Sequence, residues 1–212
     1  RKMAPNAFIA ANIGGAQLIG GMSDYSLKTM INSIQANAII VHLNPLQELI
    51  QPEGDIQFSG VLKGIEQLVK HSSVPIIVKE TGAGIDSKVA KRLLNAGVKV
   101  IDVAGVGGTS WSRVEAARKP SKWDVKFASN TLTFQYENEM EERFNEWGNS
   151  TVYCLESLRE LAWKHKFEII ASGGIRHAQD MIKAGCLGAN FVAVAQPVLR
   201  VLKDEGIDGL EK

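Results

Sequence analysis

Residues 171–176 read Ala-Ser-Gly-Gly-Ile-Arg, and about twenty residues later the chain reads Ala193-Val194-Ala195-Gln196. Each segment ends an apolar run of the kind that forms a buried parallel strand. Glycine lets the backbone approach an anion closely, and Arg176 can hold a phosphate through two hydrogen bonds. In a (β/α)8 barrel the loops after strands 7 and 8 form a recurring phosphate site. The two segments therefore predict a barrel that binds a phosphorylated cofactor.

The rest of the chain alternates between strand-like and helix-like patterns. Each apolar run is followed by residues whose apolar positions recur at helical spacing, which predicts an α/β fold with a parallel sheet. Ser59 is a candidate N-cap for one helix, Asp86 or Ser87 for the next, and Gly97 is expected to end the latter. The six predicted strands are 7–13, 38–43, 75–78, 98–104, 169–172 and 190–195.

Six strands do not close an eight-stranded barrel, and 212 residues is short for one. Two explanations compete: an open doubly wound sheet, or a TIM barrel that lacks its first two strands. Polar residues or glycines follow every predicted strand, whereas an open sheet concentrates them at one switch point. The incomplete barrel is therefore favoured, as one domain over residues 1–212 that holds strands 3–8. Residues 113–150 are expected to leave the barrel, with an exposed helix near 137–147.

Composition restricts the possible partners. The net charge is +1, so no overall field favours nucleic acid or an acidic membrane surface. No stretch is apolar and long enough to suggest a membrane span. Cys154 and Cys186 are isolated, which favours two buried thiols in a reducing compartment over a disulfide framework. A cytoplasmic protein is expected.

The densest polar cluster follows the second predicted strand, where His42-Leu43-Asn44-Pro45-Leu46-Gln47-Glu48 brings together an imidazole, two amides and a carboxylate. Pro45 is expected to stiffen a turn there. Such a turn can place a metal-binding carboxylate beside hydrogen-bonding amides. The alternative is a polar turn in which Asn44 caps its own backbone.

Two further strand ends carry candidate groups. Lys79 directly follows an apolar strand and would be costly to bury without an anion, although it could also extend to the rim or be neutralised by Glu80. The loop 105–110, Gly-Val-Gly-Gly-Thr-Ser, suits close backbone approach to a flat ligand or a phosphate. Asp102 is either a carboxylate inside the barrel or a structural partner for a loop amide.

These motifs together resemble type 2 isopentenyl-diphosphate isomerase, the flavin-dependent class, and the string from His42 to Glu48 is the most specific of them. The glycine loops, by contrast, are shared with other flavin barrels. The segments that carry the resemblance are 4–5, 9–14, 42–48, 75–82, 102–110, 144–148 and 171–176.

The resemblance implies a (β/α)8 barrel that binds FMN and a divalent metal, usually Mg²⁺, and interconverts isopentenyl and dimethylallyl diphosphates. It implies that the reduced flavin supplies the proton chemistry, with NADPH as the reductant, in a homo-oligomer. By the family pattern, the residues that contact the flavin are Asn12, Lys79 and Thr109, and those around its phosphate are Gly174, Ile175, Arg176, Ala195 and Gln196.

The same resemblance implies the roles of the cluster after the second strand. Gln47 and His42 contact the substrate, Gln47, His42 and Asn44 are the catalytic residues, and Glu48 holds the metal that bridges to the diphosphate. The chain departs from the family at Ala104, where many members have a flavin-contacting serine. It also departs at 148–151, where Gly-Asn-Ser-Thr replaces Gly-Ile-Pro-Thr.

Two other functions stay open. A flavin-barrel oxidoreductase of the 2-hydroxy-acid or dihydroorotate type would need a His or Cys base facing the flavin, and His42 is the candidate for it. A non-catalytic barrel fragment that binds a phosphorylated ligand would need none. The neighbouring Gln47 and Glu48 are better explained by a metal–diphosphate site than by the oxidoreductase, and flavin absorbance in the purified protein would separate the barrel fragment from the flavin enzymes.

Overall fold

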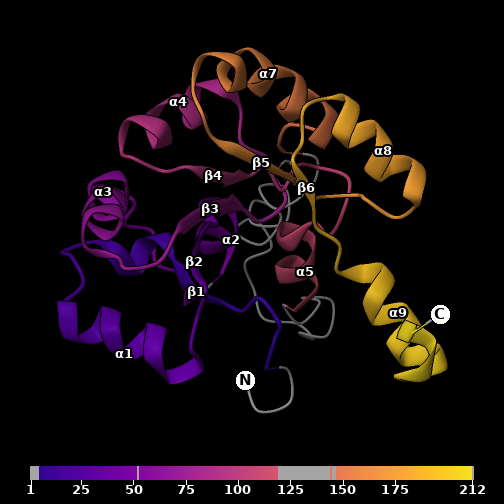
Figure 1. Cartoon of the computed structure of the whole chain (residues 1–212), viewed down its shortest axis with the longest axis horizontal. Coiled ribbons are helices and arrows are strands. Elements are labelled where there is room, and N and C mark those ends of the chain that lie inside the picture. Colours follow the sequence, from indigo (N-terminus) through magenta and orange to yellow (C-terminus); the bar gives the residue numbers. More distant parts are fainter. Residues whose placement is uncertain (1–4, 52, 119–143, 145–146, 212) are drawn as a thin grey trace, which may run out of the picture.

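A computed structural model describes residues 5–51, 53–118, 144 and 147–211. Its strands form one parallel sheet in the sequential order β1-β2-β3-β4-β5-β6 (Figure 1). The strands are β1 (Ala10–Gly14), β2 (Ala38–Leu43), β3 (Ile76–Glu80), β4 (Val100–Asp102), β5 (Glu168–Ala171) and β6 (Phe191–Val192).

The strand order decides between the two predicted architectures. An open doubly wound sheet reverses its order at a switch point, whereas the strands of a barrel follow one another around the sheet. No reversal occurs here, and each strand pairs in parallel with the next one along the chain. The prediction of an α/β fold of the barrel type is confirmed. Within the described residues the sheet is a partial barrel that does not close.

A layer of helices covers the outer face of the curved sheet (Figure 1). Successive strand residues point to opposite faces, so Ile39 and Val41 of β2 pack into the hydrophobic core beneath the helices, where Ile65 and Leu93 meet them. His42 of the same strand points to the inner face. These outer helices are α1 (Asp24–Ile34), α3 (Val61–His71), α4 (Ser87–Asn95), α7 (Thr151–Lys164) and α8 (Ala178–Cys186).

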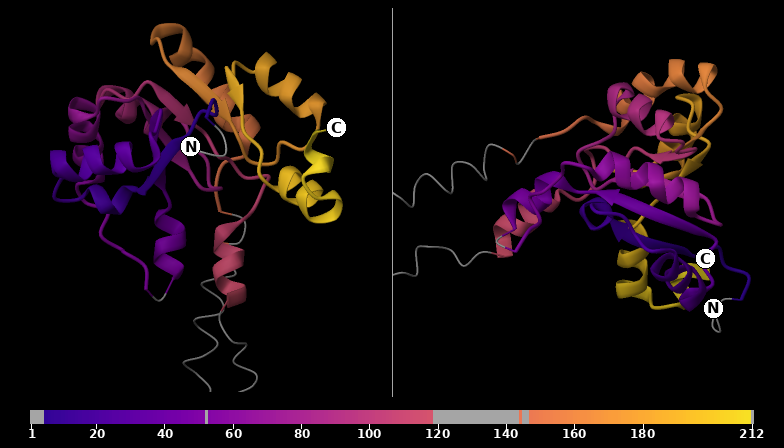
Figure 2. Two further views of the ribbon diagram at one scale, coloured as in Figure 1. Left: turned by 60° about the horizontal axis from the view of Figure 1, so that its bottom comes forward. Right: turned by 90° about the vertical axis from the view of Figure 1, so that its left-hand side faces the viewer.

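Two helices instead project from the carboxyl ends of the strands. These are α2 (Pro45–Ile50) and α5 (Trp111–Arg118), which contact each other and extend away from the sheet (Figure 2). The predicted turn at Pro45 is wrong, because this proline occupies the first position of α2. Its fixed φ and missing N–H suit a helix start, where no intrahelical bond is lost. The remaining elements are α9 (Gln196–Glu205) and the 3-10 helices η1 (Gly15–Leu18) and η3 (Asp208–Glu211).

The predicted helix ends are confirmed in part. Asp86 caps α4, since its carboxylate accepts the Val89 N–H at 3.0 Å. Gly97 follows that helix with a φ of +91°, which glycine adopts freely. Ser59 is not a cap: α3 begins after Gly60, whose φ is +101° and which has no side chain to offer.

Several other predictions have a clear outcome. The expectation of two buried thiols is confirmed for Cys154 and wrong for Cys186, which is exposed as the last residue of α8. The predicted excursion begins as helix α5, while the predicted helix at 137–147 falls largely outside the described residues. In the part of the chain that the structure describes, no helix is both long and apolar enough to cross a membrane.

Candidate functional site

Three polar side chains lie side by side on the inner face of the sheet. His42 of β2 is in register with Lys79 of β3, which is in register with Asp102 of β4. Neighbouring strands in register bring side chains of the same face together. The sheet therefore unites two of the predicted site residues, and it places Asp102 beside them.

His42 and Asn12 are brought together directly. Nδ1 of His42 lies 2.8 Å from Oδ1 of Asn12. With Oδ1 assigned to face the ring, Nδ1 carries the proton and Nε2 is left as an acceptor. Burial lowers the pKa of His42, the positive charge of Lys79 lowers it further, and Glu48 opposes both. The ring is therefore held neutral and can accept a hydrogen bond through Nε2.

A cavity of about 280 Å³ opens at the carboxyl ends of β3 to β6. Asp102 and Ser172 also line its wall. Asn12 does not line it and is placed instead against His42. The cavity collects all the other residues assigned to the flavin by resemblance: Lys79, Thr109, Gly174, Ile175, Arg176, Ala195 and Gln196.

The segment 172–176 after β5, which we name the phosphate turn, is held by main-chain and hydroxyl contacts. Thr151, at the start of α7, donates its hydroxyl to the carbonyls of Ser172 at 3.0 Å and Gly173 at 2.7 Å. The Gly105 N–H binds the Ser172 carbonyl at 3.1 Å. Gly173 has a φ of +94°, and a Cβ there would lie 2.1 Å from the Gly105 oxygen. Only glycine fits this position.

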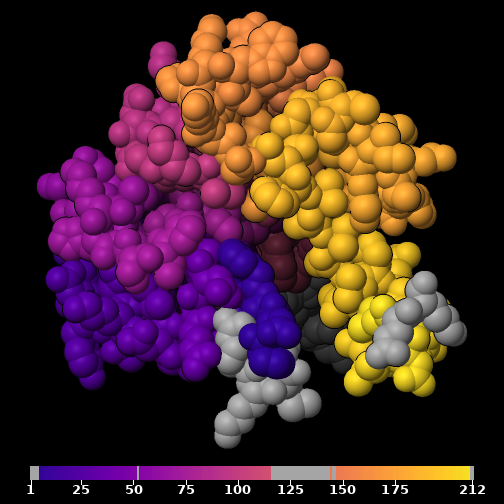
Figure 3. Space-filling model, viewed as in Figure 1, coloured from indigo at the N-terminus to yellow at the C-terminus, as the bar shows by residue number. Residues whose placement is uncertain are grey.

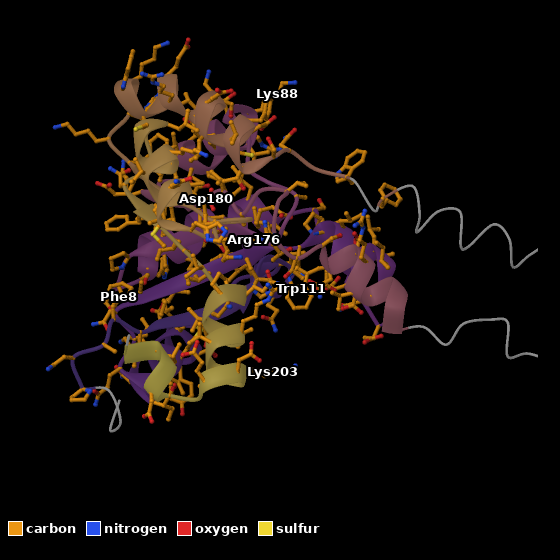
Figure 4. The ribbon with its side chains drawn as sticks, turned by 90° about the vertical axis from the view of Figure 1, so that its right-hand side faces the viewer. Phe8, Lys88, Trp111, Arg176, Asp180 and Lys203 are labelled. Atoms are coloured by element: carbon orange, nitrogen blue, oxygen red, sulfur yellow. The ribbon has the colours of Figure 1, made fainter. Side chains whose placement is uncertain are left out.

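Arg176 lies at the exposed end of the phosphate turn. Its Nη2 donates to the Gly107 carbonyl at 3.0 Å, and its backbone N–H is accepted by Asp180 of α8 at 3.0 Å. Figure 4 shows Arg176 with Asp180 nearby on one side and Trp111 on the other. A guanidinium has five N–H donors, so Arg176 keeps donors for an anion. The glycine cradle and these donors fit a phosphate-bearing ligand such as FMN.

Glu80 organises the loop between β3 and the cavity. Its Oε2 accepts the N–H groups of Thr81 and Gly82, both at 2.6 Å, of Gly84 at 3.3 Å, and of Ala83. Burial raises its pKa despite these donors. The suggested neutralisation of Lys79 by Glu80 is wrong: the Lys79 ammonium donates to the backbone oxygen of Glu80, and the carboxylate is engaged by the loop.

The second part of the site is the α2 cluster, by which we mean His42, Asn44, Gln47 and Glu48. Asn44 donates to Oε1 of Glu48 at 2.8 Å, and the Asp55 N–H binds Oε2 at 2.7 Å. Asn44 also lies 3.4 Å from Oε1 of Gln47. These bonds fix the carboxylate and both amides, so the polar-turn alternative underestimates how organised the cluster is.

A buried carboxylate that the sequence did not single out lies beneath this cluster. Glu115 of α5 is 5% exposed and accepts from Nε2 of Gln47 at 3.2 Å and from Nε2 of Gln51 at 2.7 Å. No local motif marks it, because its partners lie 64 and 68 residues away along the chain.

The α2 cluster adjoins the flavin-type cavity. Gln47 lines a small cavity of about 20 Å³, and Thr81, Gly82 and Trp111 line both this space and the larger one. Figure 3 shows the molecule hollowed between its indigo N-terminal and yellow C-terminal parts, with α5 visible in the depth. Another cavity, of about 460 Å³, extends between α3 and α4 and does not include the phosphate turn. His42 and Asn44 of the α2 cluster line this cavity.

The predicted metal site has a single candidate carboxylate among the described residues, that of Glu48. Among the described residues no group of three or more His, Cys, Asp or Glu side chains could hold a metal ion. Glu48 has each oxygen in one hydrogen bond, which leaves lone pairs available. Mg²⁺ commonly binds one or two carboxylates together with substrate phosphates. Glu48 therefore fits a metal that a diphosphate brings to the site.

Comparison with known proteins identifies the family. Residues 34–212 match the family model described as FMN-dependent dehydrogenase. The chain is 42% identical over its whole length to an isopentenyl-diphosphate delta-isomerase of Synechococcus sp., covering 56% of that protein. The corresponding proteins of Chlorobium phaeobacteroides and Stutzerimonas stutzeri are each 43% identical, over 96% and 94% of the chain and 55% and 54% of their own lengths.

The chain thus spans about half the length of the curated relatives that it matches. A family model that covers most of the chain and relatives that cover nearly all of it agree with the motifs. The chain therefore belongs to the FMN-dependent dehydrogenase family, and the predicted resemblance to type 2 isopentenyl-diphosphate isomerases is confirmed.

Proposed function

We propose that this chain forms the flavin and diphosphate sites of an enzyme that converts isopentenyl diphosphate to dimethylallyl diphosphate in isoprenoid biosynthesis. The cofactors proposed are reduced FMN and Mg²⁺, with NADPH as the reductant. One observation carries the proposal. All the flavin-type residues except Asn12 line one cavity, and Gln47 of the α2 cluster lines a small space that shares wall residues with it. The names of the relatives support the reaction.

The chemistry of the reaction favours a cofactor. Moving the double bond requires a proton to be delivered to one carbon and removed from another, and a pair of side chains would need strongly shifted pKa values to do both. Bound FMN would supply that proton chemistry, while the protein positions the substrate. In this proposal the Lys79 ammonium offers positive charge to the ring. The phosphate turn, Ala195 and Gln196 hold the phosphate.

The α2 cluster orients the substrate in this proposal. Gln47 presents its amide from the first turn of α2, where Glu115 and Asn44 fix its orientation. His42 is neutral and offers Nε2 as an acceptor. Glu48 binds the metal that neutralises the diphosphate, and Asn44 holds the carboxylate in place.

A flavin-dependent oxidoreductase is the second candidate, favoured by the description of the matching family. It would need a base at the cavity. The described residues that line the 280 Å³ cavity include no histidine or cysteine, and His42 lines the cavity between α3 and α4 instead. The barrel fragment without catalysis is the third, and flavin absorbance in the purified protein separates it from the other two.

The test is an anaerobic assay with isopentenyl diphosphate, FMN, Mg²⁺ and catalytic NADPH, followed by NMR of the products. The isomerase proposal expects dimethylallyl diphosphate in large excess over the NADPH consumed, because isomerisation has no net redox change. Product formed one-for-one with a consumed electron acceptor or donor would favour the oxidoreductase. A cytoplasmic location and a homo-oligomer stay predictions, which fractionation and light scattering would check.

A further inference from the structure

Asp102 is a buried carboxylate in the cavity wall that the proposed function leaves without a role. It ends β4, is 5% exposed and lines the same cavity as Lys79 and Arg176. Its Oδ1 accepts the Ser172 hydroxyl at 2.6 Å and the Ala104 N–H at 3.2 Å. A buried charge is costly unless it is hydrogen-bonded and paired, so the position of Asp102 calls for a physical reason.

Hydrogen bonds and a neighbouring positive charge show where the carboxylate of Asp102 acts. Burial raises its pKa, and the Ser172 hydroxyl, the Lys79 charge and the Ala104 N–H offset part of this rise because they favour the charged form. Lys79 is its cross-strand neighbour on the inner face of the sheet. In a partly buried site, charges interact several times more strongly than in water. The carboxylate therefore offsets part of the positive charge that Lys79 presents to the cavity.

Asp102 also connects two walls of the cavity. Its hydrogen bond to Ser172 joins the end of β4 to the first residue of the phosphate turn. Ala104, two residues after Asp102, has a φ of +39°, so the chain turns sharply just beyond the end of the strand. The short hydrogen bond thus fixes the distance between the Lys79 side of the cavity and the phosphate turn.

We propose that Asp102 is a positioning residue that, by offsetting the charge of Lys79 beside Ser172, lowers the electron affinity of a flavin bound in this cavity. The inference rests on the proposed flavin site. Reduction adds negative charge to the flavin, which Lys79 favours and a buried carboxylate opposes. The balance between these two side chains sets how readily the reduced form is reached.

The test is Asp102→Asn in the FMN-loaded protein, with the midpoint potential measured by spectroscopic titration. Asparagine keeps an oxygen for Ser172 and Ala104 and removes the charge. The expected result is about a tenfold shift of the oxidised–reduced equilibrium toward reduced flavin, which for a two-electron couple is about 30 mV more positive. FMN should also bind at least as tightly, because the cavity becomes more positive.

Asp86→Asn is the matched control. It removes the same charge from the helix cap of α4, outside the cavity, and asparagine caps about as well as aspartate. The potential should not move. Ser172→Ala is a second variant, used if Asp102→Asn does not fold. It removes the main donor to the carboxylate, and should move the potential by less than Asp102→Asn does.

The outcomes separate this inference from the function on which it rests. Unaltered protein that binds no FMN would overturn the proposed function and this role together. Bound FMN whose potential is the same in the unaltered protein, Asp102→Asn and Ser172→Ala would overturn the role of Asp102 alone. An equal shift in Asp86→Asn would also overturn it, because any lost charge would then have the same effect.

Discussion

The two halves of the site are built in different ways. The phosphate turn is shaped by main-chain contacts: carbonyls of Ser172 and Gly173 bind Thr151, and the glycines approach the loop at Gly105 and Gly107 within contact distance. The α2 cluster is shaped by side chains that bind one another, from Asn44 to Glu48 and from Gln47 to Glu115. We therefore expect the phosphate turn to recognise its ligand by shape, and the α2 cluster to recognise its ligand by chemical groups.

This difference predicts how each half responds to mutation. A site made of close-packed backbone has no room for one additional carbon, so small substitutions should abolish binding. A site made of side chains accepts an isosteric replacement without distortion, so it should lose chemistry while it keeps its ligand-free structure. The predictions follow from this contrast.

The largest effect is expected in the phosphate turn. Gly173→Ala would place a Cβ 2.1 Å from the Gly105 oxygen at a φ of +94°. We expect FMN affinity to fall by more than about a hundredfold and stability to fall by roughly 1–3 kcal/mol or more, from strain and clash. Fluorescence titration of FMN and thermal unfolding measure the two effects.

Gly185→Ala is its control in the same part of the fold. Gly185 lies within α8, and an added Cβ would meet nothing within 4 Å. Alanine in a helix should stabilise by roughly 0.5–1 kcal/mol and leave FMN binding intact. Equal FMN affinity in both variants would contradict the backbone account of the phosphate turn.

The next effect belongs to the α2 cluster. Glu48→Gln keeps the shape of the side chain and one acceptor oxygen but removes the charge that we propose binds Mg²⁺. We expect metal-dependent turnover to fall by about a hundredfold, a loss of about 2.7 kcal/mol in transition-state stabilisation. FMN affinity should be unchanged. Full activity, or activity that survives EDTA in the unaltered protein, would contradict the metal assignment.

A moderate effect is expected from the residue that joins α7 to the phosphate turn. Thr151→Val removes the hydroxyl that binds the carbonyls of Ser172 and Gly173. Two partly buried carbonyls then lose this donor, although the Ser172 carbonyl keeps the Gly105 N–H. We expect a loss of roughly 1–3 kcal/mol in stability and about tenfold in FMN affinity. Thr151→Ser keeps the donor and should recover most of both. If Thr151→Ser loses as much stability and FMN affinity as Thr151→Val, the missing hydroxyl is not the cause of these losses.

The smallest effect is a pH dependence of the free energy of unfolding, and it concerns only the α2 cluster. Burial and Lys79 lower the pKa of His42 below its ordinary value near 6.5. The unfolded chain therefore takes up a proton first as the pH falls, so the folded state loses stability from about pH 6.5 downward until its own pKa is passed. Urea unfolding at pH 5.5 and 7.5 should show this loss in the unaltered protein and a smaller one in His42→Gln. A larger loss of stability in His42→Gln than in the unaltered protein would contradict this assignment of the pH dependence to His42.

The sequence predicted the fold because its signal is repeated and local. Each strand is a short apolar run followed by a helix, and the six strands appear in the predicted order. Boundaries were less accurate where tertiary geometry decides them. The predicted strand 98–104 ends at Asp102, because Ala104 adopts a φ of +39° that a strand does not accommodate. The helix α2 was missed because Pro45 suits both a turn and a helix start.

The site was predictable only where residues are neighbours in sequence. The phosphate turn and the α2 cluster are each continuous segments. Thr151, Glu115 and the Asp102–Ser172 bond depend on partners 21 to 70 residues away, and no local pattern marks them. Glu80 was misinterpreted for a related reason: its position beside Lys79 suggested an ion pair, whereas the fold turns its carboxylate to four loop amides.

The most direct test of the account is a comparison of FMN with riboflavin in binding to this protein. The two ligands share the ring and differ by the phosphate that Arg176 and the phosphate turn are proposed to hold. We predict a yellow complex in which FMN binds at least about a hundredfold more tightly than riboflavin. No flavin binding, or equal affinity for the two ligands, would contradict the central claim.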